Sequence, residues 1–269
     1  MKKEISFDFG GTFTDIVIFV DGKIQKKIQK KRSDFGPRDI LKFLEKEKYD
    51  QIFTVGGNQK EVPEEINGQK IQKAKEIEAI GAGGEYLSED RVDKKMIVSL
   101  GTGVCFVLSE KNNFTHIGGS AVGGGTITGL GKIILGESSL EKLALLAKNG
   151  DENKVNLTVK DIVGEGIGLL PDWVPASYFA KVADNQKEQS REDLARSIFS
   201  MCAGVIASSA VFAAKSQNLN EFFLGGRLAN SDLIFEEIKK IGEIFEVGVK
   251  RIPQAEIMTA VGAREAGKM

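Results

Sequence analysis

A strand that runs into a glycine turn and returns as a second strand stands at the start of the chain, at residues 5–18 (ISFDFGGTFTDIVI). Apolar residues alternate on both sides of the turn, which is the period of a pleated strand. Gly10 and Gly11 let backbone N–H groups approach an anion closely, and Thr12 adds a hydroxyl donor. Asp8 ends the incoming strand, where it can hold a magnesium ion beside that anion. By itself, the hairpin fits better an ordinary tight turn whose aspartate serves the bend.

A second hairpin of the same kind, residues 96–108 (MIVSLGTGVCFVL), changes this interpretation. A further glycine cluster at residues 118–130 precedes a predicted helix, whose N-terminus favours phosphate. Two hairpins that each open one half of the chain resemble the actin, hexokinase and Hsp70 superfamily, in which the two loops clasp the nucleotide phosphates. No Walker A loop competes, because Gly131-Lys132 is followed by Ile133.

The resemblance implies a duplicated actin/hexokinase-like (ribonuclease H-like) fold of the α/β class, with two halves that flank a nucleotide cleft. We expect an N-terminal half at residues 1–95, with the first phosphate hairpin and the catalytic glutamate segment. The C-terminal half, residues 96–269, would carry the second phosphate hairpin, the acceptor loop, the adenosine loop and a dimer helix. Alternating strands and helices agree with the α/β class.

The order of elements follows from apolar periodicity and from Gly and Pro positions. The basic run at residues 23–32 is interpreted as a solvated edge strand. Strands are expected at 51–55, 221–225 and 245–249, and a loop or a short strand at 69–72. Helices are expected from Pro37, Ala79, Gly124, Ser139, Ser190, Ser231 and Ala255, and irregular structure at 151–176. The small residues of the helix at 190–216 would allow close packing, either within one chain or across a dimer.

Composition excludes several classes of function. A net charge of -1 gives no sign of a nucleic-acid partner. His116 is the only histidine, which excludes sites with several histidine ligands, and any general base is expected to be a carboxylate. Cys105 and Cys202 form no CxxC pair, which fits a reducing cytosol. The apolar stretch at 198–214 predicts a buried helix and no membrane span, and the N-terminal strand leaves no room for a signal peptide.

The sequence resembles the type II pantothenate kinases, which phosphorylate pantothenate with ATP in the first step of coenzyme A synthesis. The resemblance covers nearly the whole chain. The glycine motifs would be shared by sugar kinases, but the block at residues 149–179, which no phosphate site demands, is specific to this family. The matching segments are DFGGT at 8–12, VGGN at 55–58, EIEA at 76–79, LGTGVC at 100–105, VGGGTITGLG at 122–131, LPDWVPASYF at 170–179 and AVGARE at 260–265.

The resemblance also implies roles for individual residues. Glu76 matches the catalytic base, and Thr102, Cys105 and His116 match the acceptor pocket. Magnesium would be held by Asp8. ATP would be bound by Asp8, Gly10, Gly11, Thr12, Gly101, Thr102, Gly103, Gly123, Gly124, Gly125, Thr126, Gly225, Gly226 and Arg227. The family further implies a cytoplasmic homodimer with a small-molecule substrate, pantothenate, and no membrane partner.

Three positions depart from the family pattern. Asp15 replaces a lysine, and a negative charge near phosphates is unfavourable unless it helps to hold magnesium or faces away. Cys105 replaces a hydroxyl residue and is a weak hydrogen-bond partner. His116 replaces an arginine that grips a carboxylate, although imidazole is largely neutral near pH 7.

These departures leave alternatives open. One is a kinase of another acceptor on the same fold, such as a sugar or a neutral pantetheine-like compound. Another is a nucleotide-binding regulator without turnover. For Cys105 and His116, a core thiol and a surface strand residue remain equally good interpretations. Without the resemblance, Glu76 would be one exposed glutamate among many.

Overall fold

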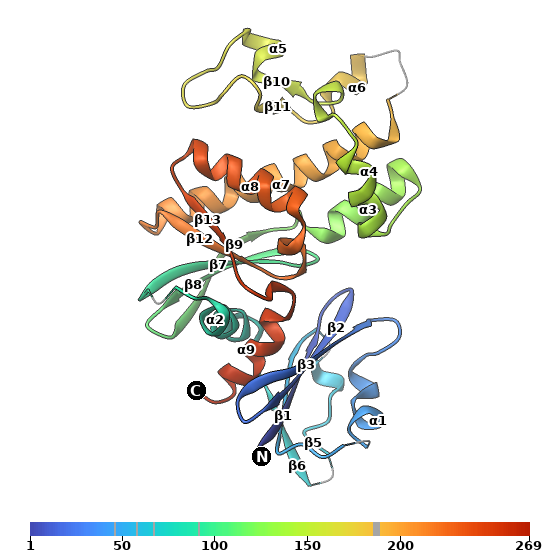
Figure 1. Cartoon of the computed structure of the whole chain (residues 1–269), viewed down its shortest axis with the longest axis vertical. Helices are drawn as coiled ribbons and strands as arrows, with labels where there is room; N and C mark the ends of the chain where they lie inside the picture. The colour runs from blue at the N-terminus through green and yellow to red at the C-terminus, as the bar shows by residue number, and fades with distance from the viewer. Residues whose placement is uncertain (46, 58, 67, 91, 185–188) are drawn as a thin grey trace.

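The computed structural model describes residues 1–45, 47–57, 59–66, 68–90, 92–184 and 189–269. Two main sheets follow one another along the long axis of the molecule, and two helices, α2 and α9, lie between them (Figure 1). A helical layer covers the far side of the second sheet, and a small segment with its own two-stranded sheet lies beyond that layer (Figure 1).

The first sheet has six strands in the order β3-β2-β1-β4-β6-β5. Its central strand, β1, pairs antiparallel with β2 and parallel with β4. The basic strand β3 forms one edge with its lysines exposed, as predicted. The bounds are β1 Lys3–Phe9, β2 Phe13–Val20, β3 Lys23–Lys31, β4 Gln51–Gly56, β5 Glu65–Ile66 and β6 Gln69–Lys73.

The second sheet repeats this scheme in the order β13-β12-β7-β8-β9. Strand β7 takes the place of β1, because it pairs antiparallel with β8 and parallel with β12. The duplication predicted from the two glycine hairpins is therefore confirmed. The bounds are β7 Lys94–Leu100, β8 Val104–Glu110, β9 Asn113–Ser120, β12 Glu221–Gly225 and β13 Gly248–Arg251, with β10 Leu157–Thr158 and β11 Pro175–Ser177 in the small sheet.

Helices fill the connections and cover the sheets. The α-helices are α1 Ile40–Leu44, α2 Glu76–Leu87, α3 Gly124–Leu135, α4 Leu140–Lys148, α5 Val159–Val163, α6 Ala180–Asp184, α7 Arg191–Ser216, α8 Asp232–Ile244 and α9 Met258–Ala266. Short 3-10 turns are η1 Pro37–Asp39, η2 Gln59–Glu61, η3 Glu152–Lys154, η4 Arg227–Asn230 and η5 Ala255–Ile257.

Helices α2 and α9 join the two sheets. Helix α9 ends the chain yet packs against β1 and β4 of the first sheet, whereas α2 packs against β7, β8 and β9 of the second. Glycines bring the two helices together: a side chain at Gly83 would run into the carbonyl of Met258, and one at Gly262 would run into the carbonyl of Ala79. The crossing therefore depends on residues without a Cβ.

Helix α7 is the one helix, among the residues that the structure describes, that is long and apolar enough to cross a membrane. It belongs to the core of the second half, since 67% of its apolar window is buried inside the molecule. Ala203, Ala207 and Ala210 are fully buried, and Gly204 lies against the Tyr178 hydroxyl. The predicted buried helix is confirmed, and its small residues serve packing within the chain.

Three local predictions are wrong. Helix α2 begins at Glu76 and not at Ala79; Lys75 caps it without a side-chain hydrogen bond, so the usual sign of a helix start is missing. The last strand begins at Gly248 and not at residue 245, because α8 continues to Ile244. Residues 151–176, expected to be irregular, contain the short elements η3, β10 and α5 and the first residues of β11.

Candidate active site

The first glycine bend connects β1 to β2. Gly10 is needed for the tightness of the turn, because an added Cβ would lie 2.9 Å from the carbonyl oxygen of Phe13. Arg32, which follows β3, donates from Nη1 to the carbonyl oxygens of Phe9 at 3.2 Å and Gly10 at 3.3 Å. Its guanidinium therefore holds the shape of the bend from behind.

The second bend, Gly101–Gly103, connects β7 to β8 and rests on the start of α3. The backbone N–H groups of Gly124 and Gly125 donate to the carbonyl oxygens of Gly101 and Thr102, each at 2.9 Å. A Cβ at Gly123 would lie 2.7 Å from the Thr102 carbonyl oxygen. The glycine cluster thus lets the helix approach the bend closely; a nucleotide contact for Gly123–Thr126 stays a prediction.

The two bends face each other, although they lie 90 residues apart in the chain. The hydroxyl oxygens of Thr12 and Thr102 are 3.4 Å apart, and a Cβ at Gly11 would lie 2.9 Å from the Thr102 hydroxyl. Both threonines are exposed. The two bends thus approach each other closely, and a ligand can reach them.

Carboxylates gather beside the first bend. Asp8 and Asp15 are directly paired residues of β1 and β2, so their side chains leave the sheet on the same face. Burial raises the pKa of Asp8 well above its ordinary value, and the negative charges of Glu76 and Asp15 raise it further. Among the described residues, the Asp8 carboxylate accepts no hydrogen bond.

Glu76 is the first residue of α2 and lies close enough to Asp8 to affect its titration. Although solvent reaches Glu76, the surrounding protein desolvates its carboxylate, and this burial raises its pKa. Glu78 instead pairs with Lys75 at 2.8 Å. On a strand the two glutamates would share a face, but the observed helix turns them about 200° apart.

Asp15 pairs with Arg227, which lies just after β12 of the other half. Arg227 Nη2 donates to both carboxylate oxygens at 2.7 Å. The guanidinium also stacks on the ring of Phe13, with Cζ 4.5 Å from the ring centroid. Burial raises the pKa of Asp15, and Arg227 opposes that rise. The departure at Asp15 is therefore balanced by an arginine from a loop expected on the adenosine side.

Gly225 and Gly226, the rest of that loop, pack against neighbouring elements. Gly225 is buried, and a side chain there would run into the Met258 sulfur. Gly226 has a φ of 82°, and a Cβ there would lie 2.5 Å from the carbonyl oxygen of Leu100. The loop therefore lies at the end of β7, next to the second bend.

Two of the three predicted acceptor residues lie with Glu76 and the bends. Thr102 is in the second bend, and Cys105 follows it on β8. Burial and the charge of Glu76 raise the pKa of the Cys105 thiol to about 11, so it is neutral at pH 7. His116 is exposed on the edge strand β9, paired with Val107, and no described contact joins it to the other two.

Two residues of this region escaped the sequence prediction. Arg32 was assigned to the solvated basic run, yet it ends that run beside the first bend. Gly56 has a φ of 100°, and a Cβ there would lie 2.9 Å from Asp8 Oδ1. The pairing of β3 with β2 would have placed Arg32, and the glycine pair after the strand at 51–55 was the signal for Gly56.

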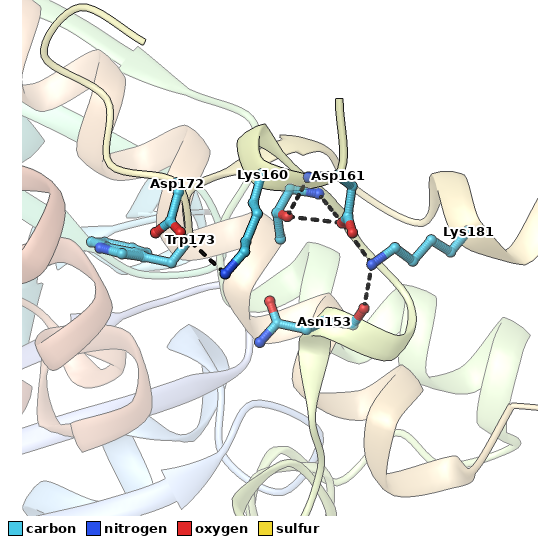
Figure 2. Close-up of a pocket in the computed structure, with 7 residues that line it drawn as sticks. Asn153, Lys160, Asp161, Asp172, Trp173 and Lys181 are labelled. Carbon is cyan, nitrogen blue, oxygen red and sulfur yellow. Dashed lines mark hydrogen bonds and ion pairs between the residues drawn. The ribbon is translucent and has the colours of Figure 1, made fainter. Parts of the chain in front are cut away.

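Two pockets of the described structure lie away from the bends. One, of about 280 Å³, is in the segment beyond the helical layer, where Lys160 lies 3.5 Å from Asp172 and Lys181 lies 2.6 Å from Asp161 (Figure 2). The other, of about 410 Å³, lies between residues 170–178 and helices α7 and α8. Each lysine of the first pocket is already paired with a carboxylate.

Comparisons with known proteins find similar sequences over most of the chain. A family model described as Fumble matches residues 39–246. A type II pantothenate kinase of Oceanobacillus iheyensis is 28% identical over 85% of this chain and 86% of its own length, and one of Bacillus cereus is 27% identical over 86% and 85%.

Solved structures show the fold. The activator of 2-hydroxyisocaproyl-CoA dehydratase from Clostridium difficile, with bound ADPNP, has a TM-score of 0.68 at 14% identity, over 99% of this chain and 94% of its own. A ROK family glucokinase from Streptomyces griseus, in complex with glucose and AMPPNP, has a TM-score of 0.58 at 14% identity, over 97% of each chain. The predicted actin/hexokinase-like fold is confirmed. Because the family model covers most of its length, the chain belongs to the Fumble family, as its relatives named type II pantothenate kinase also indicate.

Proposed function

We propose that this chain transfers a phosphoryl group from ATP to pantothenate, forming 4'-phosphopantothenate in the first step of coenzyme A synthesis. Membership of the Fumble family and the names of the curated relatives support this acceptor. The observation that carries the chemistry is the approach of two accessible bends, Thr12 to Thr102, beside Glu76 and Asp8.

ATP would lie against both bends. The backbones of Gly10–Thr12 and Gly101–Gly103 would hold the phosphates, since glycine turns expose N–H groups to anions. Gly123–Thr126 would support the nucleotide by holding the second bend in place. Gly225 and Gly226 would lie on the adenosine side, at the end of β7, and Arg227 would extend from this loop toward the first bend.

The residues present fit a magnesium ion held partly by the nucleotide. Asp8 offers a carboxylate that accepts no hydrogen bond in the described part of the chain. No group of three such ligands is assembled among the described residues, which suits an ion that keeps waters and phosphate oxygens. When bound, Mg²⁺ neutralises charge on the phosphates.

Glu76 would act as the general base. As the acceptor hydroxyl attacks the γ-phosphoryl group, its proton would pass to the Glu76 carboxylate. The raised pKa of Glu76 makes the carboxylate a better proton acceptor than an ordinary glutamate.

The acceptor would lie beside Glu76, with Thr102 and Cys105 at one end and His116 on the neighbouring strand. A second candidate acceptor is a neutral pantetheine-like compound or a sugar. Two observations favour it: Cys105 is a neutral thiol, and His116 makes no described contact that would fix it as a carboxylate clamp.

We also propose the wider organisation that the family implies. Residues 1–95 and 96–269 would act as two halves around the nucleotide, with α9 crossing back to the first sheet. The chain would work as a cytoplasmic homodimer on a small molecule, without nucleic-acid or membrane partners. Mass measurement by light scattering tests the dimer.

The test of the activity is ADP release from Mg-ATP by the purified protein. Pantothenate, pantetheine, a sugar panel and no acceptor are run side by side. Stimulation by pantothenate is the expected result. Stimulation by another acceptor alone would keep the kinase and change the substrate, and ATP binding without any stimulation would favour a regulator.

A further inference from the structure

The ion pair between Asp15 and Arg227 connects the two halves directly beside the first bend. Asp15 is on β2, and Arg227 opens η4, 212 residues later. Phe13, on whose ring the guanidinium stacks, is the residue that follows Thr12 of the bend. The Asp15 side chain is only 11% exposed, whereas the Arg227 side chain is 30% exposed. The arginine is therefore held by the first half but remains open to a ligand.

The pairing leaves part of the guanidinium available. A guanidinium has five N–H donors in a planar fork. Asp15 uses a single nitrogen, Nη2, for both of its oxygens. In the part of the chain that the structure describes, Nε and Nη1 of Arg227 make no hydrogen bond. The stacking on Phe13 fixes the plane of these free donors.

The site carries several negative charges, which a cation such as Arg227 would offset when a nucleotide binds. Asp8, Asp15 and Glu76 place three carboxylates beside the bends, and Arg227 is the cation that lowers the pKa of Asp8. The nearby Arg32 already donates from Nη1 to the carbonyl oxygens of the first bend. A nucleotide adds several negative charges, and arginine binds phosphate through charge-assisted hydrogen bonds.

We infer that Arg227 contacts the nucleotide phosphates through its free Nε and Nη1 donors, and that Asp15 is the positioning residue that holds the guanidinium there. The inference rests on the proposed function only in requiring that the chain binds ATP. A cation from the C-terminal half thus faces phosphates that lie against the first bend, and the negative charge of Asp15 serves to orient it. The competing explanation is an ion pair that only holds the halves together.

Nucleotide binding separates the two explanations. Dissociation constants for ATP and for adenosine are measured by calorimetry with R227M, which keeps the length of the side chain, and with R227K, which keeps its charge. Arg251 is the matched control: it also stacks on an aromatic ring, Phe235, at 4.2 Å and pairs with an aspartate, Asp232, at 3.0 Å, but on the edge strand β13.

We expect R227M to weaken ATP binding by about 10- to 100-fold and R227K to weaken it less, with adenosine affinity unchanged within about two-fold. R251M should leave both ligands unaffected. Unchanged ATP affinity in R227M, or an equal loss for adenosine, would overturn the inference. Thermal unfolding checks that each variant is folded. If R227M is not folded, the ATP and adenosine affinities of R227K are used in its place.

The role of Asp15 is tested in both backgrounds. D15N should weaken ATP binding by about three-fold or more in the wild-type chain, because the guanidinium loses its anchor, and should not weaken it in R227M. Tighter ATP binding by D15N in the wild-type chain would show that Asp15 only repels phosphate. Because no acceptor is present, a failure of the pantothenate assay leaves this result intact, whereas a wild-type chain that binds no ATP contradicts both proposals.

Discussion

Replacing Glu76 by glutamine tests the chemistry while changing little else. Glu76→Gln keeps the shape of the side chain but removes the carboxylate that would accept the proton. A positioned general base contributes about 100- to 10,000-fold to a rate, so kcat should fall by that factor, or about 3–5 kcal/mol in the activation barrier.

The structure also predicts what the substitution leaves intact. The charge of Glu76 raises the pKa of Asp8, so its removal makes Asp8 easier to ionise. Glu76 also lies in the first turn of α2, where a negative charge stabilises a helix by up to about 1 kcal/mol, and this is lost. The two effects on the stability of the fold oppose each other, so we expect little change in melting temperature. Because Asp8 ionises more easily, we expect the ATP affinity in Mg²⁺ to be kept or improved.

Glu78→Gln is the matched control. It removes a glutamate of the same helix turn, two residues away, that pairs with Lys75 and not with the site. The assay is acceptor-dependent ADP release at saturating substrates, together with ATP binding. E78Q should stay within about two-fold of wild type, because an exposed ion pair contributes little. Full activity in E76Q, or equal losses in the two variants, would refute the assignment of the base.

Three further predictions concern titration, the metal site and the helix crossing. Because Glu76 must be ionised to act and burial raises its pKa, kcat/KM should fall as pH falls through that raised pKa, and a profile that falls only at or below the pKa of an ordinary glutamate would contradict this. Without Mg²⁺, the free energy of unfolding should decrease as pH rises from the ordinary carboxyl pKa through the raised pKa of Asp8, since the folded state keeps that proton longer. Asp8→Asn should reduce this slope to the part that comes from the raised pKa values of Asp15 and Glu76, and should weaken activation by Mg²⁺. An unchanged slope would argue against the raised pKa of Asp8. Gly83→Ala should lower the free energy of unfolding in urea by about 1–3 kcal/mol, because the added Cβ meets Met258. Gly129→Ala on α3 is the control: it has open space around it and should be neutral or stabilise by up to about 1 kcal/mol. Similar values for both variants would refute the close crossing of α2 and α9.

Much of the fold could be predicted because its signals are local. The alternation around Asp8 and its repeat at residues 96–108 gave both glycine hairpins, and the long apolar pattern gave α7. Elements of two to five residues, such as β10 and α5, are too short for a period to show. The start of α2 was missed because no capping side chain marks it.

The site could be predicted in its parts but not in its contacts. Motifs and family resemblance singled out Asp8, Thr12, Thr102 and Glu76, and the structure brings them into one region, although their roles stay predictions. The partner of Asp15 could not be found, because Arg227 lies 212 residues away and meets it only through the packing of the two halves. Arg32 was hidden for a similar reason, since its role depends on which strand β3 pairs with.

Phosphorylation of pantothenate is tested most directly by mass spectrometry of pantothenate after incubation with the protein and Mg-ATP, with E76Q as the blank. We predict that pantothenate gains the mass of one phosphoryl group while one ADP appears for each product molecule. If pantothenate stays unmodified while the protein binds ATP, pantothenate is not the acceptor, whether or not another compound is phosphorylated.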